Sequence, residues 1–375
     1  MRGGRRRAEL LLIFTILLVY SQCSVAPRLA LSCPSRRAAA LGVAGSAVLL
    51  RSPSAHARQP LVFDQTIAES GLEDWSTKDY EAMRDDVPRT SRFEAAIKRR
   101  LASAGNATVV DIGTGPFALL ALIAAKAGAR KVYAVEKNAA AAAQAKETVQ
   151  KEGLQDVVTV IEGDAMKVDL PERVDFVVSE LIGSIATQEG VEPIIRDARK
   201  RFLKDDSGCG MIPSRCQTCV VPILYKGRSF MARLLSPFAG VRSRGKAEPG
   251  TNLPLRIKSA DEENMEFLAE PQILEDFDYC SGESSTSQLQ PQKTFEFKVD
   301  PSGSCRFSGF AMWTRVVVDE TDVIEVRGQP DSHWAYVVSL MSPQPCTVED
   351  GTIVLNSGID YTASPVRYSF HAEVA

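Results

Sequence analysis

The chain has 375 residues, and its 45% hydrophobic content is enough for one large core and a second packed unit. Eight arginines and one glutamate give the first 57 residues a formal charge of +7, so the whole-chain charge of −3 leaves −10 on the rest. An acidic body argues against direct nucleic-acid binding, because it repels phosphate backbones, and it favours cationic partners. The alternative interpretation is that the net negative charge only keeps the protein soluble.

Residues 1–57 are predicted to be an N-terminal targeting leader. Four arginines within the first seven positions precede an apolar run at 10–20 that is too short to span a bilayer. A twin arginine at 36–37 then precedes a mildly apolar segment that ends in an A-x-A pattern at 55–57, as in twin-arginine export signals. We therefore expect a transit peptide that is cleaved near Arg58, and no stable membrane insertion after processing. The expected location is the plastid, with the thylakoid lumen as the candidate compartment within it. A signal for the secretory pathway is the alternative.

Residues 58–213 are predicted to form a cofactor-binding, Rossmann-like domain with a preceding helix. Apolar residues at helical spacing predict that helix over 79–101. Short apolar strands then alternate with helices, which is typical of a doubly wound parallel sheet. The expected strands are 108–112, 131–136, 157–161 and 174–179, and the expected helices are 116–127, 138–152 and 191–203.

A glycine-rich turn marks the candidate cofactor site. Gly113 and Gly115 follow the strand that contains Asp111 and open the next helix, so the backbone can approach a ligand there. Glu136 ends the following strand, where its carboxylate can accept both hydroxyls of a ribose, and Asp164 can accept the adenine amino group. These positions are the carboxyl ends of parallel strands, where ligands bind. On these residues alone, a nicotinamide dehydrogenase is the alternative to a methyltransferase.

Two glutamates follow the fourth strand. Glu180 and Glu189 are nine positions apart with Gly183 between them, a spacing that suits a hairpin loop and brings both carboxylates to one place. Facing carboxylates repel, so one takes a proton unless a cation lies between them. A guanidinium is the matching cation, because it is planar, charged and presents a fork that carboxylates meet bidentately. Without further context, a loop with one solvated glutamate is the alternative.

Residues 214–375 are predicted to form an antiparallel β-barrel or sandwich, because short runs rich in Val, Phe and Thr are separated by turn residues. Charge and helix-like spacing near 240–268 indicate an excursion from this domain. Cys216 and Cys219 have the spacing of half a zinc site, but no second pair accompanies them and no metal is expected. The expected strands are 219–224, 294–299, 307–318, 334–341 and 352–355.

Ordered segments across 79–375 resemble the protein arginine methyltransferase family. The resemblance implies an α/β fold with a Rossmann-like methyltransferase domain followed by a β-barrel, S-adenosylmethionine as the cofactor, and an arginine-containing protein as the substrate. It leaves a homodimer open as the assembly. The segments are DYEAMRDDVPRTSRF at 79–93, VDIGTG at 110–115 with AGARKVYAVE at 127–136, the two glutamates in 180–189, FLK at 202–204 with GMIPS at 210–214, and SHW at 332–334.

The resemblance also assigns roles to side chains. It implies that Arg89 pairs with the methionine carboxylate of the cofactor and that Glu136 binds the ribose. Glu180 and Glu189 would clamp the acceptor guanidinium as the catalytic pair. Met83 would pack beside the acceptor. Each of these residues also has a plainer interpretation. Met83, for example, would be an ordinary core residue.

A histidine far along the chain completes the resemblance. His333 would pair with Asp86 at the mouth of the acceptor site and so bring the helix ahead of the sheet against the barrel. We expect the carboxylate to raise the pKa of the imidazole by favouring its charged form. The proton released by the acceptor would leave through Glu189 or through this pair. The alternative is a solvated His333 at the end of a surface strand.

The double-glutamate loop departs from the common family pattern. Leu181, Ile182, Ser184 and Gln188 stand where tryptophan, methionine and aromatic residues are usual, which resembles the symmetric-dimethylating branch. That branch lacks the histidine kept here at His333, so the product type is left open. A methyltransferase for another acceptor and a non-catalytic cofactor-binding scaffold are the alternative functions.

Overall fold

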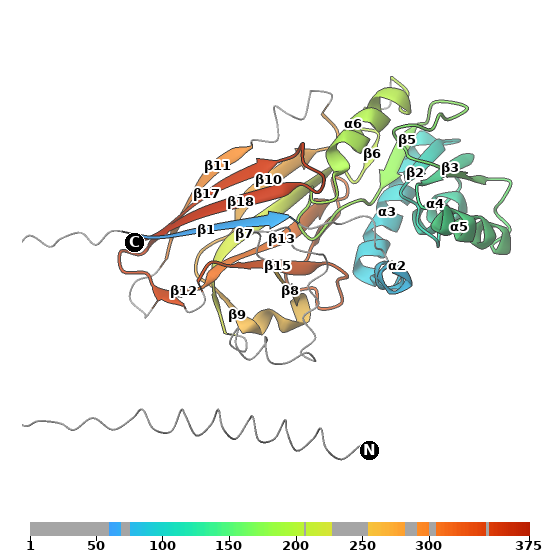
Figure 1. The fold of residues 1–375 in the computed structure, drawn as a ribbon. Helices are drawn as coiled ribbons and strands as arrows, with labels where there is room; N and C mark the ends of the chain where they lie inside the picture. The colour runs from blue at the N-terminus through green and yellow to red at the C-terminus, as the bar shows by residue number, and fades with distance from the viewer. Residues whose placement is uncertain are drawn as a thin grey trace, which may run out of the picture. The chain divides into compact units, whose positions relative to one another are not determined.

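A computed structural model describes residues 60–68, 76–205, 208–226, 254–281, 291–299, 305–342 and 345–375. The described residues all belong to one compact unit, Ala57–Ala375. The predicted leader 1–57 lies outside the described residues, so the fold concerns this unit (Figure 1). No helix within the described ranges is long and apolar enough to cross a membrane.

The first part of this unit is built on a parallel sheet of five strands in the order β4-β3-β2-β5-β6. The chain runs from β2 outward to β4 and then returns to β5 on the other side of β2. The carboxyl ends of β2 and β5 therefore border the switch point at which doubly wound sheets bind ligands. The elements are β2 (Thr108–Ile112), α4 (Leu119–Lys126), β3 (Lys131–Glu136), α5 (Ala139–Lys151), β4 (Val158–Glu162), β5 (Phe176–Ser179), α6 (Val191–Arg201) and β6 (Met211–Ile212).

The helix predicted over 79–101 is two helices, α2 (Thr77–Arg84) and α3 (Val87–Ala104). The chain breaks at Asp86, which is the N-cap of α3 and accepts the backbone N–H of Arg89 at 3.0 Å. Pro88 lies in the first turn of α3, where a missing N–H costs no helical hydrogen bond. The apolar spacing is continuous across the break, but the cap and the proline start a new helix.

The second part of the unit is antiparallel and consists of two main sheets. One sheet has the order β10-β7-β13-β15-β8, with β14 beside β13 and β9 beside β7, and the other has the order β1-β18-β17-β11. Apolar side chains of both sheets form a common core. The strands are β1 (Leu61–Ala68), β7 (Arg215–Tyr225), β8 (Leu255–Lys258), β9 (Met265–Phe267), β10 (Gln272–Asp278), β11 (Gln292–Lys298), β13 (Gly309–Val317), β14 (Val323–Glu325), β15 (Ala335–Leu340), β17 (Thr352–Asp360) and β18 (Arg367–Val374), with β12 (Arg306–Phe307) paired to β16 (Cys346–Thr347).

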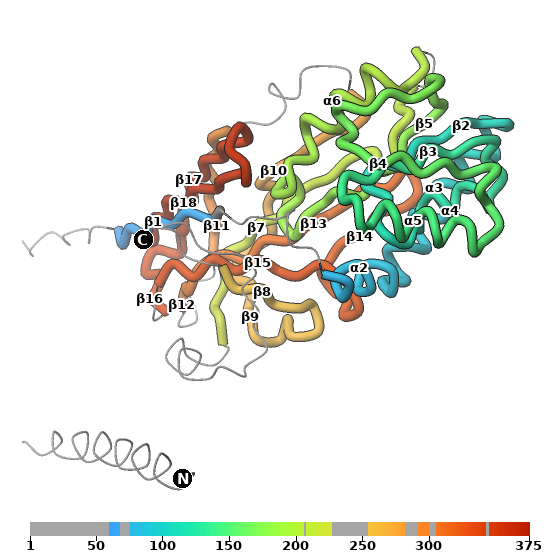
Figure 2. The backbone as a smooth tube through the Cα atoms, turned by 45° about the vertical axis from the view of Figure 1, so that its right-hand side comes forward, coloured from blue at the N-terminus to red at the C-terminus, as the bar shows by residue number. Residues whose placement is uncertain are grey.

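Strand β1 corrects the predicted domain boundary. Residues 61–68 were expected within the cofactor-binding range 58–213, but β1 pairs along its whole length with β18 (Figure 2). Ile67 is buried in the core between the antiparallel sheets, and Phe63 packs against it. The alternation of these apolar residues with polar ones suits a half-buried edge strand.

The expected excursion near 240–268 is also partly corrected. Residues 240–253 lie outside the described residues, whereas β8 and β9 belong to the larger antiparallel sheet. Only the short 3-10 helix Ser259–Asn264 between them is helical. Ile257 is buried, while its neighbour Lys258 is exposed, so this segment follows the strand period rather than the helical one.

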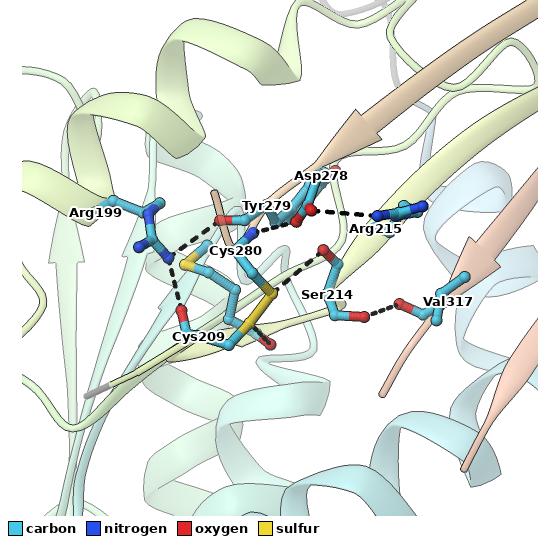
Figure 3. Close-up of a disulfide and its surroundings, with 9 residues drawn as sticks. Arg199, Cys209, Ser214, Arg215, Asp278, Tyr279, Cys280 and Val317 are labelled. Carbon is cyan, nitrogen blue, oxygen red and sulfur yellow. Dashed lines mark hydrogen bonds and ion pairs between the residues drawn. A yellow bond between two sulfur atoms is a disulfide. The ribbon is translucent and has the colours of Figure 1, made fainter. Parts of the chain in front are cut away.

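A disulfide joins the two parts of the unit. Cys209, in the loop before β6, is bonded to Cys280, which follows β10 (Figure 3). Arg199 of α6 donates from Nη1 to the carbonyl of Cys209 at 2.6 Å and to that of Tyr279 at 3.2 Å, so it bridges the same junction. The sequence analysis did not find this pair, because the connectivity of several cysteines does not follow from their spacing.

Candidate active site

The loop 180–189 leaves the carboxyl end of β5, and residues 182–187 at its centre contact the antiparallel part of the unit. The indole Nε1 of Trp334 donates to the carbonyl of Ile182 at 2.8 Å, and the Thr314 hydroxyl donates to the carbonyl of Gly183 at 2.6 Å. Ile185 is fully buried in the core between the antiparallel sheets. The parallel sheet therefore supplies the base of this loop, and the antiparallel sheets set the conformation of its tip.

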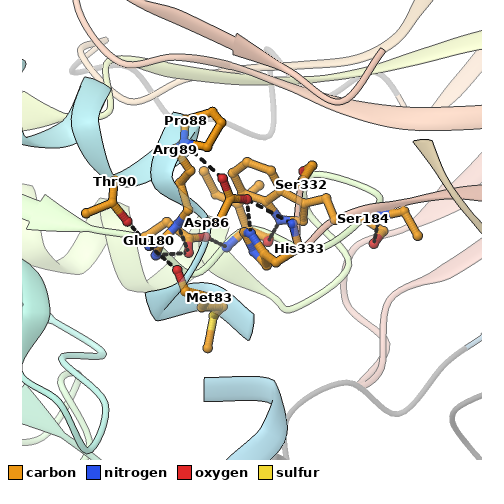
Figure 4. A network of polar contacts seen from close by, with 12 residues as sticks. Met83, Asp86, Pro88, Arg89, Thr90, Glu180, Ser184, Ser332 and His333 are labelled. Carbon is orange, nitrogen blue, oxygen red and sulfur yellow. Dashed lines mark hydrogen bonds and ion pairs between the residues drawn. The ribbon is translucent and has the colours of Figure 1, made fainter. Parts of the chain in front are cut away.

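Glu180 forms a buried ion pair with Arg89 of α3. Nε of Arg89 donates to Oε2 of Glu180 at 3.0 Å, and Nη2 contacts the same oxygen (Figure 4). The two side chains are 6% and 4% exposed, so water screens this pair little. Nη1 of Arg89 also donates to the carbonyl of Met83 at 3.3 Å. The predicted cofactor-binding arginine is thus held directly beside one of the two predicted acceptor-binding carboxylates.

Glu189 lies at the other end of the loop and is partly buried. Burial raises its pKa to about 8, with a further increase from the negative charge of Glu180 and an opposing effect of Arg256. At neutral pH this carboxyl is therefore mostly protonated, while Glu180 has the Arg89 guanidinium as its ion-pair partner. The raised pKa of Glu189 has the direction expected for one of two neighbouring carboxyl groups with no cation between them.

Asp86 and His333, which are 247 positions apart, are in contact. Oδ2 of Asp86 accepts hydrogen bonds from the backbone N–H and from Nδ1 of His333, each at 2.8 Å. An ionised carboxylate can only accept, so Nδ1 carries the proton and Nε2 is the basic nitrogen of the ring. The predicted contact is present, and it joins the start of α3 to the segment ahead of β15 (Figure 4).

The predicted pKa shift of His333 is wrong in direction. Burial lowers the pKa of this imidazole, and this effect exceeds the opposing effects of Asp86 and Glu180. Its side chain is only 8% exposed, so the charged ring loses most of its hydration. For Asp86 burial acts in the opposite direction and raises the pKa. The hydrogen bonds that Asp86 accepts from His333 and Arg89 outweigh this effect and bring its pKa below the usual value. The pair is therefore a carboxylate beside a neutral imidazole.

The glycine turn between β2 and α4 has the backbone conformation expected where the main chain approaches a ligand closely. Gly113 and Gly115 have φ angles of 76° and 65°, in the left-handed region that favours glycine. A Cβ on Gly113 would lie 2.4 Å from Cδ2 of Leu181, so the turn packs directly under the double-glutamate loop. A Cβ on Gly115 would lie 3.4 Å from the ring of Tyr80. The turn is thus enclosed between the loop and α2.

Glu136 ends β3 beside this turn, with 8% of its surface exposed. Its Oε2 accepts the N–H of Gly115 at 2.9 Å, and its Oε1 accepts that of Asn138 at 2.8 Å. Each carboxylate oxygen can accept a second hydrogen bond, so the residue fits a pair of ribose hydroxyls. These residues therefore fit a nucleoside cofactor.

The other two predicted cofactor residues differ in exposure. Asp111 is 2% exposed and accepts from the Thr114 hydroxyl at 2.6 Å and from the Ala121 N–H at 3.0 Å. It therefore supports the turn from within, and burial raises its pKa to about 6. Asp164 is 28% exposed and accepts the N–H of Met166 at 3.0 Å. Direct contact of either residue with a cofactor stays a prediction.

Tyr80 of α2 is a candidate site residue that lies within the helix predicted over 79–101 but received no role from the sequence. Burial raises its pKa to about 12, and the next contributions come from the charges of Glu136 and Glu189. Tyr80 therefore lies near both the predicted ribose carboxylate and the predicted acceptor carboxylate. Its position three residues before Met83, on the same face of α2, was the available signal. Met83 itself is partly buried and lies beside the Arg89–Glu180 pair (Figure 4).

The part of the chain that carries this site matches known proteins. The family model described as PRMT5 arginine-N-methyltransferase matches residues 71–211. Protein arginine N-methyltransferase PRMT10 of Arabidopsis thaliana is 27% identical over 298 residues, which cover 72% of this chain and 76% of that protein. Probable protein arginine N-methyltransferase 6 of the same plant is 35% identical over 149 residues, which cover 40% of this chain and 33% of that protein. The chain is thus similar to protein arginine methyltransferases.

Solved structures of arginine methyltransferases share the fold. The structure of Arabidopsis thaliana protein arginine methyltransferase 10 has a TM-score of 0.58 and 24% identity, covering 78% of this chain and 91% of that one. The Trypanosoma brucei PRMT1 enzyme–prozyme heterotetrameric complex with AdoHcy also has a TM-score of 0.58, with 21% identity and coverage of 75% and 87%. The predicted architecture, a Rossmann-like domain followed by an antiparallel β-barrel domain, is confirmed.

Proposed function

We propose that this arginine methyltransferase transfers a methyl group from S-adenosylmethionine to guanidinium nitrogens of arginine in protein substrates. The observation that carries this proposal is the carboxyl pair on one loop: Glu180 forms a buried ion pair with Arg89, while burial and the charge of Glu180 raise the pKa of Glu189 to about 8. Such a pair is poised to bind a planar cation, which would stabilise both carboxylates in their ionised form.

The residues beside the glycine turn are the candidates for holding the cofactor. Glu136 would bind the ribose hydroxyls, and Arg89 would pair with the methionine carboxylate. Gly113 and Gly115 let the backbone approach closely. When bound, S-adenosylmethionine supplies an electrophilic methyl group on its sulfonium sulfur. A solved trypanosome relative contains AdoHcy, which supports the same choice of cofactor here.

Glu180 and Glu189 would act on the acceptor by charge and position. Both carboxylates would face one end of the guanidinium and draw its positive charge there, which leaves the other nitrogen richer in electrons for attack. Holding the acceptor in line with the methyl group lowers the barrier mainly through alignment and electrostatics. The proton lost by the methylated nitrogen would leave through Glu189 or through Nε2 of His333, which Asp86 holds in place.

The test is a reaction of the full chain with isotopically labelled S-adenosylmethionine and an arginine-rich peptide, analysed by mass spectrometry. Label on arginine supports the proposal, and fragmentation of the product separates monomethyl, symmetric and asymmetric dimethyl arginine. Label that appears on a small molecule or on another side chain would show that the acceptor is not arginine. Cofactor binding without transfer to any acceptor would favour a scaffold role.

The location and the assembly are separate proposals. The twin-arginine pattern and the A-x-A sequence within residues 1–57 support a leader that directs the protein to a plastid, extending to the thylakoid lumen, with a mature N-terminus near Arg58. Sequencing of the native N-terminus tests this, and a start upstream of residue 36 would contradict it. A homodimer is the proposed assembly, supported by one solved relative, the trypanosome enzyme–prozyme complex, which is a heterotetramer. Light scattering of the purified protein measures its mass.

A further inference from the structure

A buried glutamate outside the acceptor pair lies beneath the double-glutamate loop. Glu275 on β10 is 1% exposed and belongs to the antiparallel sheet. The register of β10 against β7 shifts between Ile273 and Glu275, so Leu274 is an extra residue at a β-bulge. Bulges re-aim side chains, and here Leu274 and Glu275 are both buried although they are adjacent in a strand.

Hydroxyl groups from separate parts of the fold converge on this carboxylate. Oε2 of Glu275 accepts the Thr218 hydroxyl of β7 at 2.5 Å, and Tyr368 of β18 donates to Oε1 at 3.5 Å. Tyr361, in the turn after β17, also hydrogen-bonds to Glu275. Burial raises the pKa of Glu275, and the hydroxyl hydrogen bonds oppose this effect. A buried carboxylate is costly unless its oxygens are satisfied, and these hydroxyls satisfy them.

Two of the contacts of Glu275 lead into the loop that carries Glu180 and Glu189. The Thr187 hydroxyl, two residues before Glu189, donates directly to Oε1 of Glu275. The Thr218 hydroxyl that donates to Glu275 also accepts the backbone N–H of Ala186 at 2.9 Å. The carboxylate thus holds both the backbone and a side chain of the loop at consecutive positions.

We propose that Glu275 is a positioning residue that sets the place of Glu189 through Thr187 and Ala186. This inference rests on the proposed function of the loop. The Glu189 end of the loop turns at Gly190, which has a φ angle of 69°, opens α6 and donates its N–H to the carbonyl of Thr187 at 2.9 Å. The backbone of Thr187 is thus joined to the residue that follows Glu189. The contacts of Glu275 and Thr218 with residues 186–187 hold this turn from the β-barrel.

Substitution of Thr187 separates positioning from folding. Thr187→Val keeps the shape of the side chain and removes the hydroxyl, while Glu275 retains its contacts with Thr218, Tyr361 and Tyr368. We expect kcat for methyl transfer to fall roughly tenfold or more, because a hydrogen bond to a charged group is lost at the loop. The KM for S-adenosylmethionine should stay unchanged, since Glu136 and the glycine turn do not contact Thr187. Thr187→Ser keeps the hydroxyl and should recover most of kcat.

The matched control is Thr294→Val on β11, where the same hydroxyl is removed from an exposed hydrogen bond to Asn356. Glu275→Gln is the companion variant and should lower kcat at least as much as Thr187→Val. If wild-type protein methylates arginine and Thr187→Val keeps the wild-type kcat, the positioning role of Glu275 is wrong. Equal activity of Thr187→Val and Thr187→Ser, both reduced, would also contradict it. If wild-type protein transfers no methyl group to arginine, the proposed function fails instead.

Discussion

Oδ2 of Asp86 accepts both the backbone N–H and Nδ1 of His333 at 2.8 Å, while Oδ1 of the same carboxylate accepts the N–H of Arg89 at 3.0 Å. One side chain therefore caps α3, orients Arg89 at the cofactor side and fixes an imidazole from the β-barrel domain. Asp86 couples the two halves of the site, and its own substitution would disturb both at once. Replacement of His333 is the more selective test.

His333→Ala should lower kcat by about a hundredfold if Nε2 takes up the departing proton, the lower end of typical effects for general acid–base groups. Cofactor affinity should change little, because Arg89 and Glu136 are left in place. His371→Ala is the control: Nδ1 of His371 on β18 also lies 2.8 Å from a carboxylate, that of Asp64 on β1, but this pair is exposed. An unchanged rate in His333→Ala would remove the catalytic role and leave the contact a purely structural one.

Glu189 should control the pH dependence of acceptor binding. Its pKa is raised to about 8, so below that pH it carries a proton and cannot attract a guanidinium. We expect kcat/KM for an arginine peptide to rise with pH, roughly tenfold per unit below the pKa, and to level off above it. The KM for S-adenosylmethionine, measured over the same range, should not follow this curve. A profile that is flat from pH 6 to 9 would show that Glu189 is already ionised or does not bind the acceptor.

Glu136→Gln should weaken S-adenosylmethionine binding by roughly tenfold or more, since a charged acceptor for two hydroxyls becomes neutral. The amide nitrogen would also face the N–H of Gly115 or Asn138, both of which donate to the native carboxylate. Glu162→Gln is a matched control, because Glu162 is opposite Glu136 in the neighbouring strand and is exposed. Calorimetry that finds equal affinities for both variants would contradict the ribose assignment.

Loss of the Cys209–Cys280 disulfide should destabilise the junction of the two domains. The bond spans 71 residues of sequence, and removal of a native disulfide typically costs about 2–5 kcal/mol. We expect a lower Tm for the double variant Cys209→Ser, Cys280→Ser, and the same decrease for wild-type protein in the presence of a reductant. Cys346→Ser, at a free cysteine, controls for the substitution. If reductant leaves the Tm of wild-type protein unchanged, the bond does not stabilise the fold.

The parallel strands and the double-glutamate loop could be predicted from sequence because each signal is local. Residues 108–112 and 131–136 are apolar runs bounded by turns, and the structure has strands at these same positions. The partner of Asp86 was found through the family resemblance rather than through spacing, since the two residues are 247 positions apart.

What sequence could not supply was burial and long-range pairing. The direction of the pKa shift of His333 depends on how completely the ring is buried, and a carboxylate neighbour alone suggests the opposite sign. The pairing of β1 with β18 joins opposite ends of the described chain. Glu275 resembles a surface residue in an alternating strand until the bulge at Leu274 turns it inward.

Binding of the acceptor guanidinium by Glu189 is tested by the rate at which Glu189→Gln transfers a methyl group to an arginine peptide. Glu180→Gln is a less selective variant, because it also breaks the ion pair with Arg89. Loss of one member of a desolvated charge contact costs about 2–5 kcal/mol, so we expect a loss on the order of a hundredfold with unchanged S-adenosylmethionine affinity. If Glu189→Gln methylates the peptide at the wild-type rate, Glu189 does not bind the acceptor.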